Sequence, residues 1–195
     1  VGSCDNGTEF SLAGHRKYFA EEKFPADYNL EIQGADYVAT FIAEKFGLAG
    51  PVNTFSTACS SGAGAIIKGA EMIMAGIVDA AVVGGIDIAS DTTLIGFSAL
   101  EAVSSEITNP FSKNRHGITL GDGAAFFVLT REPLERDSAD STLPAVKLLG
   151  WGESADAYHM TSPDPSGVGA EKAISRALEN ARLSVSEVGY INLHG

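Results

Sequence analysis

The feature that most constrains the fold is the pattern of residues 51–86. Residues 51–57 have the character of a short strand, Ile66 to Ala75 follow a helical pattern, and residues 80–86 form a continuous apolar run between turn residues. A run of that kind is typical of a strand buried on both faces. A strand, a helix and a second strand within about 35 residues predict a crossover unit. The sequence therefore indicates an α/β fold.

Cys59 lies in the turn between the first predicted strand and the helix. A thiol at such a turn faces the positive end of the helix dipole, beside backbone N–H groups that are free to bind an anion. The small residues around it, among them Ser60, Ser61 and Gly62, let a substrate carbonyl approach the backbone closely. Most free cysteines are buried and inert, so the turn alone leaves a structural and a nucleophilic interpretation open.

The rest of the chain also reads as alternating elements. The first 33 residues show no clean period, and residues 104–117 are polar and typical of a loop. Apolar spacing predicts helices over residues 34–46 and 169–183, and strands over residues 123–130, 144–152 and 188–193. His194 stands at the carboxyl end of the last strand, where ligands of open α/β sheets tend to bind.

Composition narrows the class of protein. The chain has 195 residues, of which 45% are hydrophobic, enough for a sizeable core. Its net charge of −12 disfavours nucleic acid as a partner. Two cysteines without a repeat pattern fit a reducing compartment rather than a disulfide scaffold. We see no leader peptide and no apolar run long enough to span a membrane, so we expect a cytoplasmic protein.

Two local groups of residues invite a chemical interpretation. Lys113, Arg115 and Asp122 flank a glycine-rich entry into a predicted strand, and we expect them to form a buried charge network. Residues 156–163 form a polar loop with an aromatic and a histidine, a weak signal by itself. The four histidines are scattered without metal-ligand spacing, so no metal centre is predicted.

Six stretches, taken together and in order, resemble the β-ketoacyl-acyl-carrier-protein synthases, the condensing enzymes of the thiolase fold. They are residues 56–62 (STACSSG), 83–85 (VGG), 110–117 (PFSKNRHG), 121–124 (GDGA), 156–161 (DAYHMT) and 190–195 (YINLHG). They extend from about residue 50 to the end of the chain. The branch that elongates fatty acids and type II polyketides is the most similar one.

The resemblance implies roles for four substrate-facing residues. Cys59 would take an acyl chain from a carrier-protein thioester, and His194 would be the first of two active-site histidines. Thr161 would hydrogen-bond the phosphopantetheine arm, and Phe97 would lie near the acyl pocket. The reaction implied is decarboxylative condensation of the Cys-bound acyl chain with malonyl-acyl carrier protein, giving 3-oxoacyl-acyl carrier protein. The chain would thus belong to an acyltransferase.

Four more residues would support that site. Asn192 and the Leu193 carbonyl would touch a structural cation, as in some members of the family, and Lys113 and Asp122 would belong to the supporting charge network. Many relatives have Glu at the position of Asp122. His116 also replaces the acidic residue that is usual between the Arg and the Gly of this motif. No cofactor is expected beyond the phosphopantetheine that the substrate carries and a possible monovalent cation.

The resemblance also implies a larger protein. The expected fold is thiolase-like, a layered α/β structure with a mostly buried sheet, of which residues 1–195 would be the central portion: the end of the N-terminal half and the start of the C-terminal half. The family's second histidine and lysine follow the first histidine, so we expect this chain alone to be inactive in condensation. Expected partners are acyl carrier protein, acyl and malonyl thioesters, and a second subunit in a homodimer or heterodimer.

Three other functions remain open. A non-catalytic partner subunit that sets chain length usually lacks the nucleophile, whereas Cys59 is present. A coenzyme A-dependent thiolase would use a second cysteine as base, and the position of Cys4 fits poorly. A papain-like cysteine hydrolase would match the long separation of Cys59 and His194, but the residues around Cys59 lack its local pattern.

Overall fold

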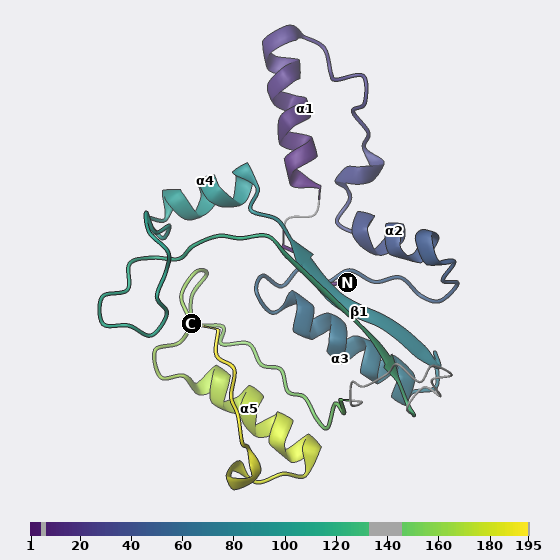
Figure 1. The fold of residues 1–195 in the computed structure, drawn as a ribbon, viewed down its shortest axis with the longest axis vertical. Helices are drawn as coiled ribbons and strands as arrows, with labels where there is room; N and C mark the ends of the chain where they lie inside the picture. Colours follow the sequence, from purple (N-terminus) through teal and green to yellow (C-terminus); the bar gives the residue numbers. More distant parts are fainter. Residues whose placement is uncertain (5–6, 133–145, 195) are drawn as a thin grey trace, which may run out of the picture. The chain divides into compact units, whose positions relative to one another are not determined.

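The computed structural model describes residues 1–4, 7–132 and 146–194, which fall into two units, Val1–Glu132 and Pro133–Gly195. The elements of each unit follow chain order (Figure 1). The first unit contains α1 (Thr8–Glu21), η1 (Glu31–Gln33), α2 (Tyr37–Phe46), α3 (Ser61–Met74), β1 (Ala80–Asp87), α4 (Asp91–Ala99) and β2 (Gly123–Thr130). The second contains α5 (Val168–Ala181) and η2 (Val185–Glu187).

The first unit contains a small mixed sheet, made of β1, β2 and two short extended segments. β1 and β2 pair antiparallel from Ala80 opposite Thr130 to Asp87 opposite Gly123. Gly2 lies on the other side of β1, and it forms parallel bridges with both Gly85 and Phe55. The order across the sheet is therefore residues 53–55, residues 1–3, β1 and β2. The segments on either side of α3 run parallel, as a crossover unit requires, which confirms that prediction.

The core lies where α3 packs on β1, and Figure 1 shows the two side by side. Small and branched residues of α3 are almost fully buried: Ala65, Gly69 and Ile73, which follow one another at four-residue spacing on one face, and Ile67 on the other. A Cβ on Gly69 would lie 2.4 Å from Val83 Cγ1, so glycine permits this close approach of helix and strand. The helical pattern predicted over Ile66 to Ala75 is confirmed by α3, which ends at Met74, just before the left-handed Gly76 with φ +70°.

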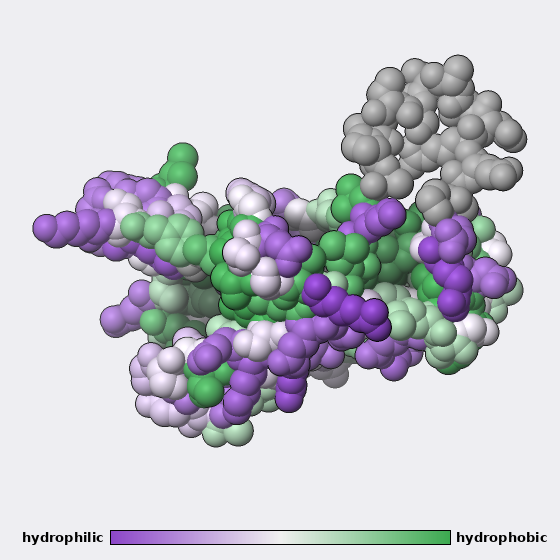
Figure 2. Space-filling view, turned by 90° about the horizontal axis from the view of Figure 1, so that it is seen from below, coloured by the Kyte–Doolittle hydropathy of each residue, from purple (hydrophilic) through white to green (hydrophobic). Residues whose placement is uncertain are grey.

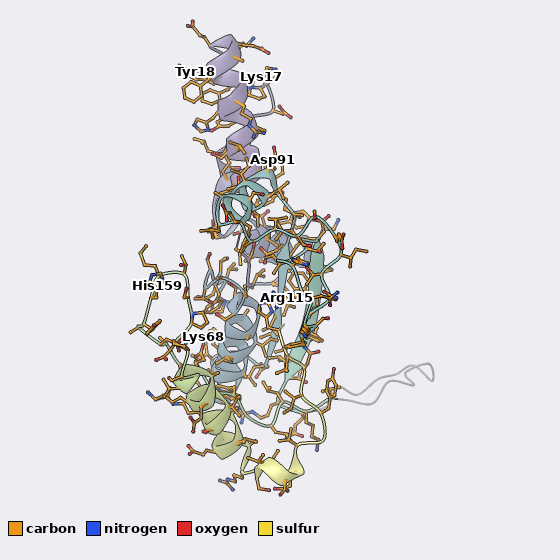
Figure 3. The ribbon with its side chains drawn as sticks, turned by 90° about the vertical axis from the view of Figure 1, so that its left-hand side faces the viewer. Lys17, Tyr18, Lys68, Asp91, Arg115 and His159 are labelled. Atoms are coloured by element: carbon orange, nitrogen blue, oxygen red, sulfur yellow. The ribbon has the colours of Figure 1, made fainter. Side chains whose placement is uncertain are left out.

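α1 and α4 were not predicted. α1 lacks a continuous apolar stripe, so periodicity gave no signal over its residues. Polar contacts hold α1 instead: the Arg16 guanidinium pairs with the Asp91 carboxylate at 2.6 Å, and the Asp91 amide donates to the Glu9 carboxylate at 3.0 Å. Figure 3 shows Asp91 close to α1. These bonds fasten α1 to the first turn of α4.

Three predicted strands are not regular strands in the described residues. Residues 53–55 bond to residues 1–3 without a continuous ladder, and residues 146–152 and 188–193 have no strand assignment. Residues 144–145 lie outside the described residues. A strand needs a neighbour to satisfy its backbone groups, and residues 146–152 and 188–193 pair with no strand among the described residues of their unit. The helix predicted over 169–183 is confirmed as α5.

β2 forms as predicted, but it is not buried in this chain. The side chains of Phe127 and Val128 are 56% and 59% exposed. Figure 2 shows hydrophobic residues reaching the surface over much of the face it presents. Among the described residues, no helix is both long enough and apolar enough to cross a membrane.

Candidate active site

Cys59 lies on a tight turn at the start of α3. Ala58, directly before it, has φ +53°, a left-handed conformation that costs a non-glycine residue about 1–2 kcal/mol. α3 begins two residues after Cys59, at Ser61. The Cys59 thiol is free and exposed, as a nucleophile requires. The predicted location of Cys59, a turn that leads into a helix, is therefore confirmed.

The Ser61 hydroxyl holds this turn in shape. Its Oγ accepts a hydrogen bond from the Thr57 amide at 2.8 Å and donates one to the Ala58 carbonyl at 2.6 Å. Ser61 is only 2% exposed, so water does not replace these bonds. The neighbouring Ser60 hydroxyl is exposed and donates to the Thr57 carbonyl at 2.7 Å. Ser61 thus fixes the backbone on both sides of Cys59 from within the core.

We expect Ser61→Ala to lower the free energy of unfolding by about 1–3 kcal/mol, because it leaves the Thr57 amide without its partner and removes one of the two hydrogen bonds to the Ala58 carbonyl. Urea unfolding measures the change. Ser60→Ala is the matched control: its hydroxyl is exposed, so the same substitution there should stay within about 0.5 kcal/mol. Equal losses for the two variants would contradict the role assigned to Ser61.

The segment before α1 packs directly against this turn. A Cβ on Gly2 would lie 2.3 Å from the Ser61 carbonyl carbon and 2.4 Å from the Gly62 nitrogen, so the backbones of residue 2 and α3 are in contact. The Asp87 carboxylate, at the end of β1, accepts from Ser3 Oγ at 3.0 Å and from the Cys4 amide at 2.7 Å. β1 therefore anchors the residues that lie beside the Cys59 turn.

Cys4 ends the described segment that packs, at Gly2, against the beginning of α3 beside Cys59. Burial and then the negative charge of Asp87 raise the pKa of the Cys4 thiol, an effect to which Cys59 adds, while a hydrogen bond with the Ser61 side chain lowers it in part. The Cys4 thiol is therefore protonated at neutral pH. The sequence gave no signal of this arrangement, because 54 residues separate Cys4 from Cys59.

Of the remaining predicted residues of the first unit, Lys113, Arg115 and Asp122 lie on connecting loops, and Phe97 lies half-buried on α4. Asp122 accepts a hydrogen bond from the Ala89 amide at 2.6 Å, and Arg115 donates to the Gly117 carbonyl at 3.2 Å. The ion pairs of the described residues do not include Lys113, Arg115 or Asp122, and all three are exposed. The structure thus does not bring them into the buried charge network we expected.

The second unit carries the other predicted residues. The Thr161 amide donates to His159 Nδ1 at 3.2 Å, on the loop before α5 where Figure 3 labels His159. Asn192 Oδ1 accepts from the Tyr190 hydroxyl at 3.3 Å. Leu193 and His194 are exposed and follow directly. The pairing of His194 with Cys59, which belongs to the other unit, stays a prediction.

The two family models that match this chain divide it between them. The model of the β-ketoacyl synthase N-terminal domain matches residues 4–134, and that of the C-terminal domain matches residues 146–195. The chain belongs to the β-ketoacyl synthase family. The resemblance inferred from the six sequence stretches is thereby confirmed, and Cys59 lies in the N-terminal domain of the family.

Curated relatives agree with the family. The chain is 36% identical to 3-oxoacyl-[acyl-carrier-protein] synthase 2 of Vibrio harveyi and 35% identical to the protein of the same name from Vibrio cholerae. Both alignments cover all of this chain, but only 48% and 49% of the relative. The chain thus spans about half the length of the curated relatives it matches.

Solved structures support the predicted fold class. A ketosynthase in complex with its chain length factor from Xenorhabdus doucetiae matches with a TM-score of 0.87 and 40% sequence identity, over 100% of this chain and 47% of that one. A β-ketoacyl synthase from Burkholderia phymatum matches with a TM-score of 0.84 and 26% identity, over 100% and 48%. The thiolase-like α/β architecture is therefore confirmed for the part of the fold that this chain covers.

Proposed function

We propose that the protein containing this chain is a β-ketoacyl-acyl-carrier-protein synthase that uses Cys59 as its nucleophile. The observation that carries the proposal is the exposed Cys59 thiol, which follows the left-handed residue Ala58 and precedes a 14-residue helix by two residues, in a chain that matches both domains of the family. A free thiol at such a turn is suited to attack a thioester carbonyl.

The first step transfers an acyl chain to the protein. The Cys59 sulfur attacks the carbonyl carbon of an acyl thioester, and backbone N–H groups beside the turn stabilise the oxyanion that forms. The carbon–sulfur bond to the donor breaks, the donor thiol leaves with a proton, and the acyl group remains on Cys59. Thr161, with a backbone bonded to His159, would hold the phosphopantetheine arm, and Phe97 would contact the acyl chain.

The second step forms a carbon–carbon bond. A malonyl thioester loses carbon dioxide, and the resulting enolate attacks the acyl carbon on Cys59. The Cys59 sulfur leaves, and a 3-oxoacyl thioester is released. His194, with the second histidine of the family, would stabilise the enolate oxygen by hydrogen bonding. Covalent catalysis divides one difficult condensation into these two easier steps.

The proposal includes partners and a location. We propose acyl carrier protein as the donor and acceptor of the thioesters, because relatives 36% and 35% identical bear that substrate in their names. We propose a dimer, and a heterodimer is favoured over a homodimer because the ketosynthase structure 40% identical to this chain is a complex with a chain length factor. We propose a cytoplasmic location, where carrier-protein thioesters and free thiols coexist.

No catalytic step is assigned to a cation. Asn192 Oδ1 and the Leu193 carbonyl are oxygen donors of the kind that hard cations take, but Asn192 Oδ1 already accepts from Tyr190. These two residues would hold such an ion, which would supply only a fixed charge beside His194. We propose that this chain is the central portion of the family fold. Its second unit would then contain Asn192, Leu193 and His194 together.

A coenzyme A-dependent thiolase is a weaker alternative. It would need Cys4 as its base, and the structure does bring Cys4 near Cys59. However, burial and Asp87 raise the pKa of Cys4, which keeps its thiol protonated at neutral pH and unsuited to accept a proton. A chain-length partner without catalysis is disfavoured by the exposed Cys59 thiol.

The test is to incubate the full-length protein with an acyl thioester of acyl carrier protein and, separately, of coenzyme A. We expect a mass increase equal to one acyl group, mapped to the Cys59 peptide, that forms faster from the carrier-protein donor and disappears when malonyl-acyl carrier protein is added. An adduct that forms only from coenzyme A would favour the thiolase. Peptide hydrolysis without any adduct would favour the hydrolase.

A further inference from the structure

Cys4 and Cys59 follow two extended segments that lie side by side in the first unit. The Phe55 amide donates to the Val1 carbonyl at 2.8 Å, and the Ser3 amide donates to the Phe55 carbonyl at 3.0 Å. Paired strands of this kind are about 4.8 Å apart. Each segment leads into its cysteine within a few residues, and both thiols are free and exposed.

Ser61 and Asp87 hold the two cysteines at one place. The Ser61 hydroxyl donates to the carbonyl of Ala58, the residue bonded to Cys59, and it also interacts with the Cys4 thiol. The Cys59 thiol is near enough to Cys4 to act on it electrostatically. Asp87 fixes the Cys4 backbone through its amide at 2.7 Å. The two thiols therefore belong to one site.

The surroundings of Cys4 suit it to react second during oxidation, as a resolving cysteine that attacks an already oxidised Cys59. Burial and the charge of Asp87 raise its pKa, so it is a protonated thiol at neutral pH. Protonated thiols react poorly with peroxides, because the thiolate is the nucleophile. Because Cys4 is held as a thiol, we expect a peroxide to react first with Cys59, which is exposed on its turn.

We propose that Cys4 and Cys59 form a reversible disulfide when a peroxide oxidises the protein. The Cys59 sulfur attacks one oxygen of hydrogen peroxide, the oxygen–oxygen bond breaks, and a sulfenic acid and one water result. The Cys4 sulfur then attacks the Cys59 sulfur, the sulfur–oxygen bond breaks, and hydroxide leaves as water with the proton of Cys4. The two thiols lose two electrons in total, and these reduce the peroxide to two waters.

The disulfide would protect Cys59 from irreversible oxidation. A dithiol reductant returns both thiols by exchange, whereas a sulfinic acid on Cys59 would not be reduced. If the protein has the function proposed above, the disulfide also prevents acyl transfer to Cys59 until both thiols are restored. The formation of the bond itself requires no thioester, so it is tested separately from that function.

The experiment treats the full-length protein with a small molar excess of hydrogen peroxide, enough for two oxidations of each Cys59, blocks remaining thiols with N-ethylmaleimide, and analyses the peptides by mass spectrometry. We expect one linked pair of peptides that contain Cys4 and Cys59, lighter by two hydrogens and separated by dithiothreitol. Cys4→Ser and Cys4→Ala should instead accumulate a Cys59 peptide with two added oxygens, which dithiothreitol does not reverse.

Three results would overturn the proposal. The first is a Cys59 sulfinic acid in the unsubstituted protein with Cys4 still blocked by N-ethylmaleimide. The second is that dithiothreitol reverses the oxidation of Cys59 in both Cys4 variants as completely as it does in the unsubstituted protein. The third is a linked pair that forms only between two protein molecules, detected as a covalent dimer. Acyl loading of the untreated protein, measured in parallel, reports on the proposed function alone, so the two proposals fail independently.

Discussion

Replacing Cys59 with alanine should lower the rate of acyl loading by at least about a thousandfold, because the substitution removes the only atom that forms the covalent bond. The loss should appear as the absence of the acyl mass increase after incubation with acyl-acyl carrier protein. Condensation with malonyl-acyl carrier protein should fall in parallel. The same protein should unfold in urea within about 0.5 kcal/mol of the unsubstituted one, because the Cys59 side chain is exposed.

The control for this experiment is Cys4→Ser, which removes the other cysteine of the chain. Its thiol is protonated at neutral pH, so the variant should keep the acyl group on the Cys59 peptide. Acyl loading that survives in Cys59→Ala would refute the assignment of the nucleophile. If that residual adduct mapped to Cys4, the acyl acceptor would be the cysteine we regard as the resolving one.

Replacing Gly2 with alanine should lower the free energy of unfolding by about 1–3 kcal/mol and should also slow acyl loading. The new methyl group would lie 2.3 Å from the Ser61 carbonyl carbon and 2.4 Å from the Ser61 oxygen. Both are backbone atoms at the beginning of α3, so no side-chain rotation relieves the clash. Either α3 or the segment of Gly2 must move, and Cys59 lies on the turn between them. Urea unfolding and the rate of adduct formation measure the two effects.

Gly62→Ala is the matched control, since a Cβ there has no atom within 4 Å. Gly62 is the second residue of α3, next to the atoms that Gly2 contacts. The substitution of alanine there should not destabilise the protein, because alanine is the better helix former. Similar losses of stability for Gly2→Ala and Gly62→Ala would mean that the contact with Ser61 is not the cause. A stable Gly2→Ala variant with unchanged loading would show that α3 accommodates the methyl group freely.

The parts of the structure that could be predicted are those with a local sequence signal. The apolar run over residues 80–86, the helix that precedes it and the thiol in the turn between strand and helix all follow from periodicity and turn chemistry. α1 could not be predicted in this way, because its fixed points are Arg16 and Glu9 bound to a residue far along the chain. No local pattern reveals such a contact.

The candidate site divides in the same manner. Cys59 was found from its turn, but Ser61, Gly2 and Asp87 were not singled out, since their roles depend on segments that meet only in the folded chain. The network expected around Lys113 and Asp122 did not form. Both side chains are exposed, and neither takes part in the ion pairs of the described residues, because nearness in sequence does not decide which way charged side chains point. Sequence identifies the reactive atom more readily than the atoms that position it.

The insertion of residues 1–3 between residues 53–55 and β1 has a consequence for folding order. The Gly2 amide donates to Gly84 at 2.8 Å, and the Ile86 amide donates back to Gly2 at 3.1 Å. During synthesis Gly2 therefore lacks its partners on β1 until residue 86 has left the ribosome, although residues 53–55 are available earlier. Such long-range pairing is slow, because closing a large loop precedes any gain from the contact. We expect the packing of residues 1–3 against the reactive turn to be completed only after β1 has formed.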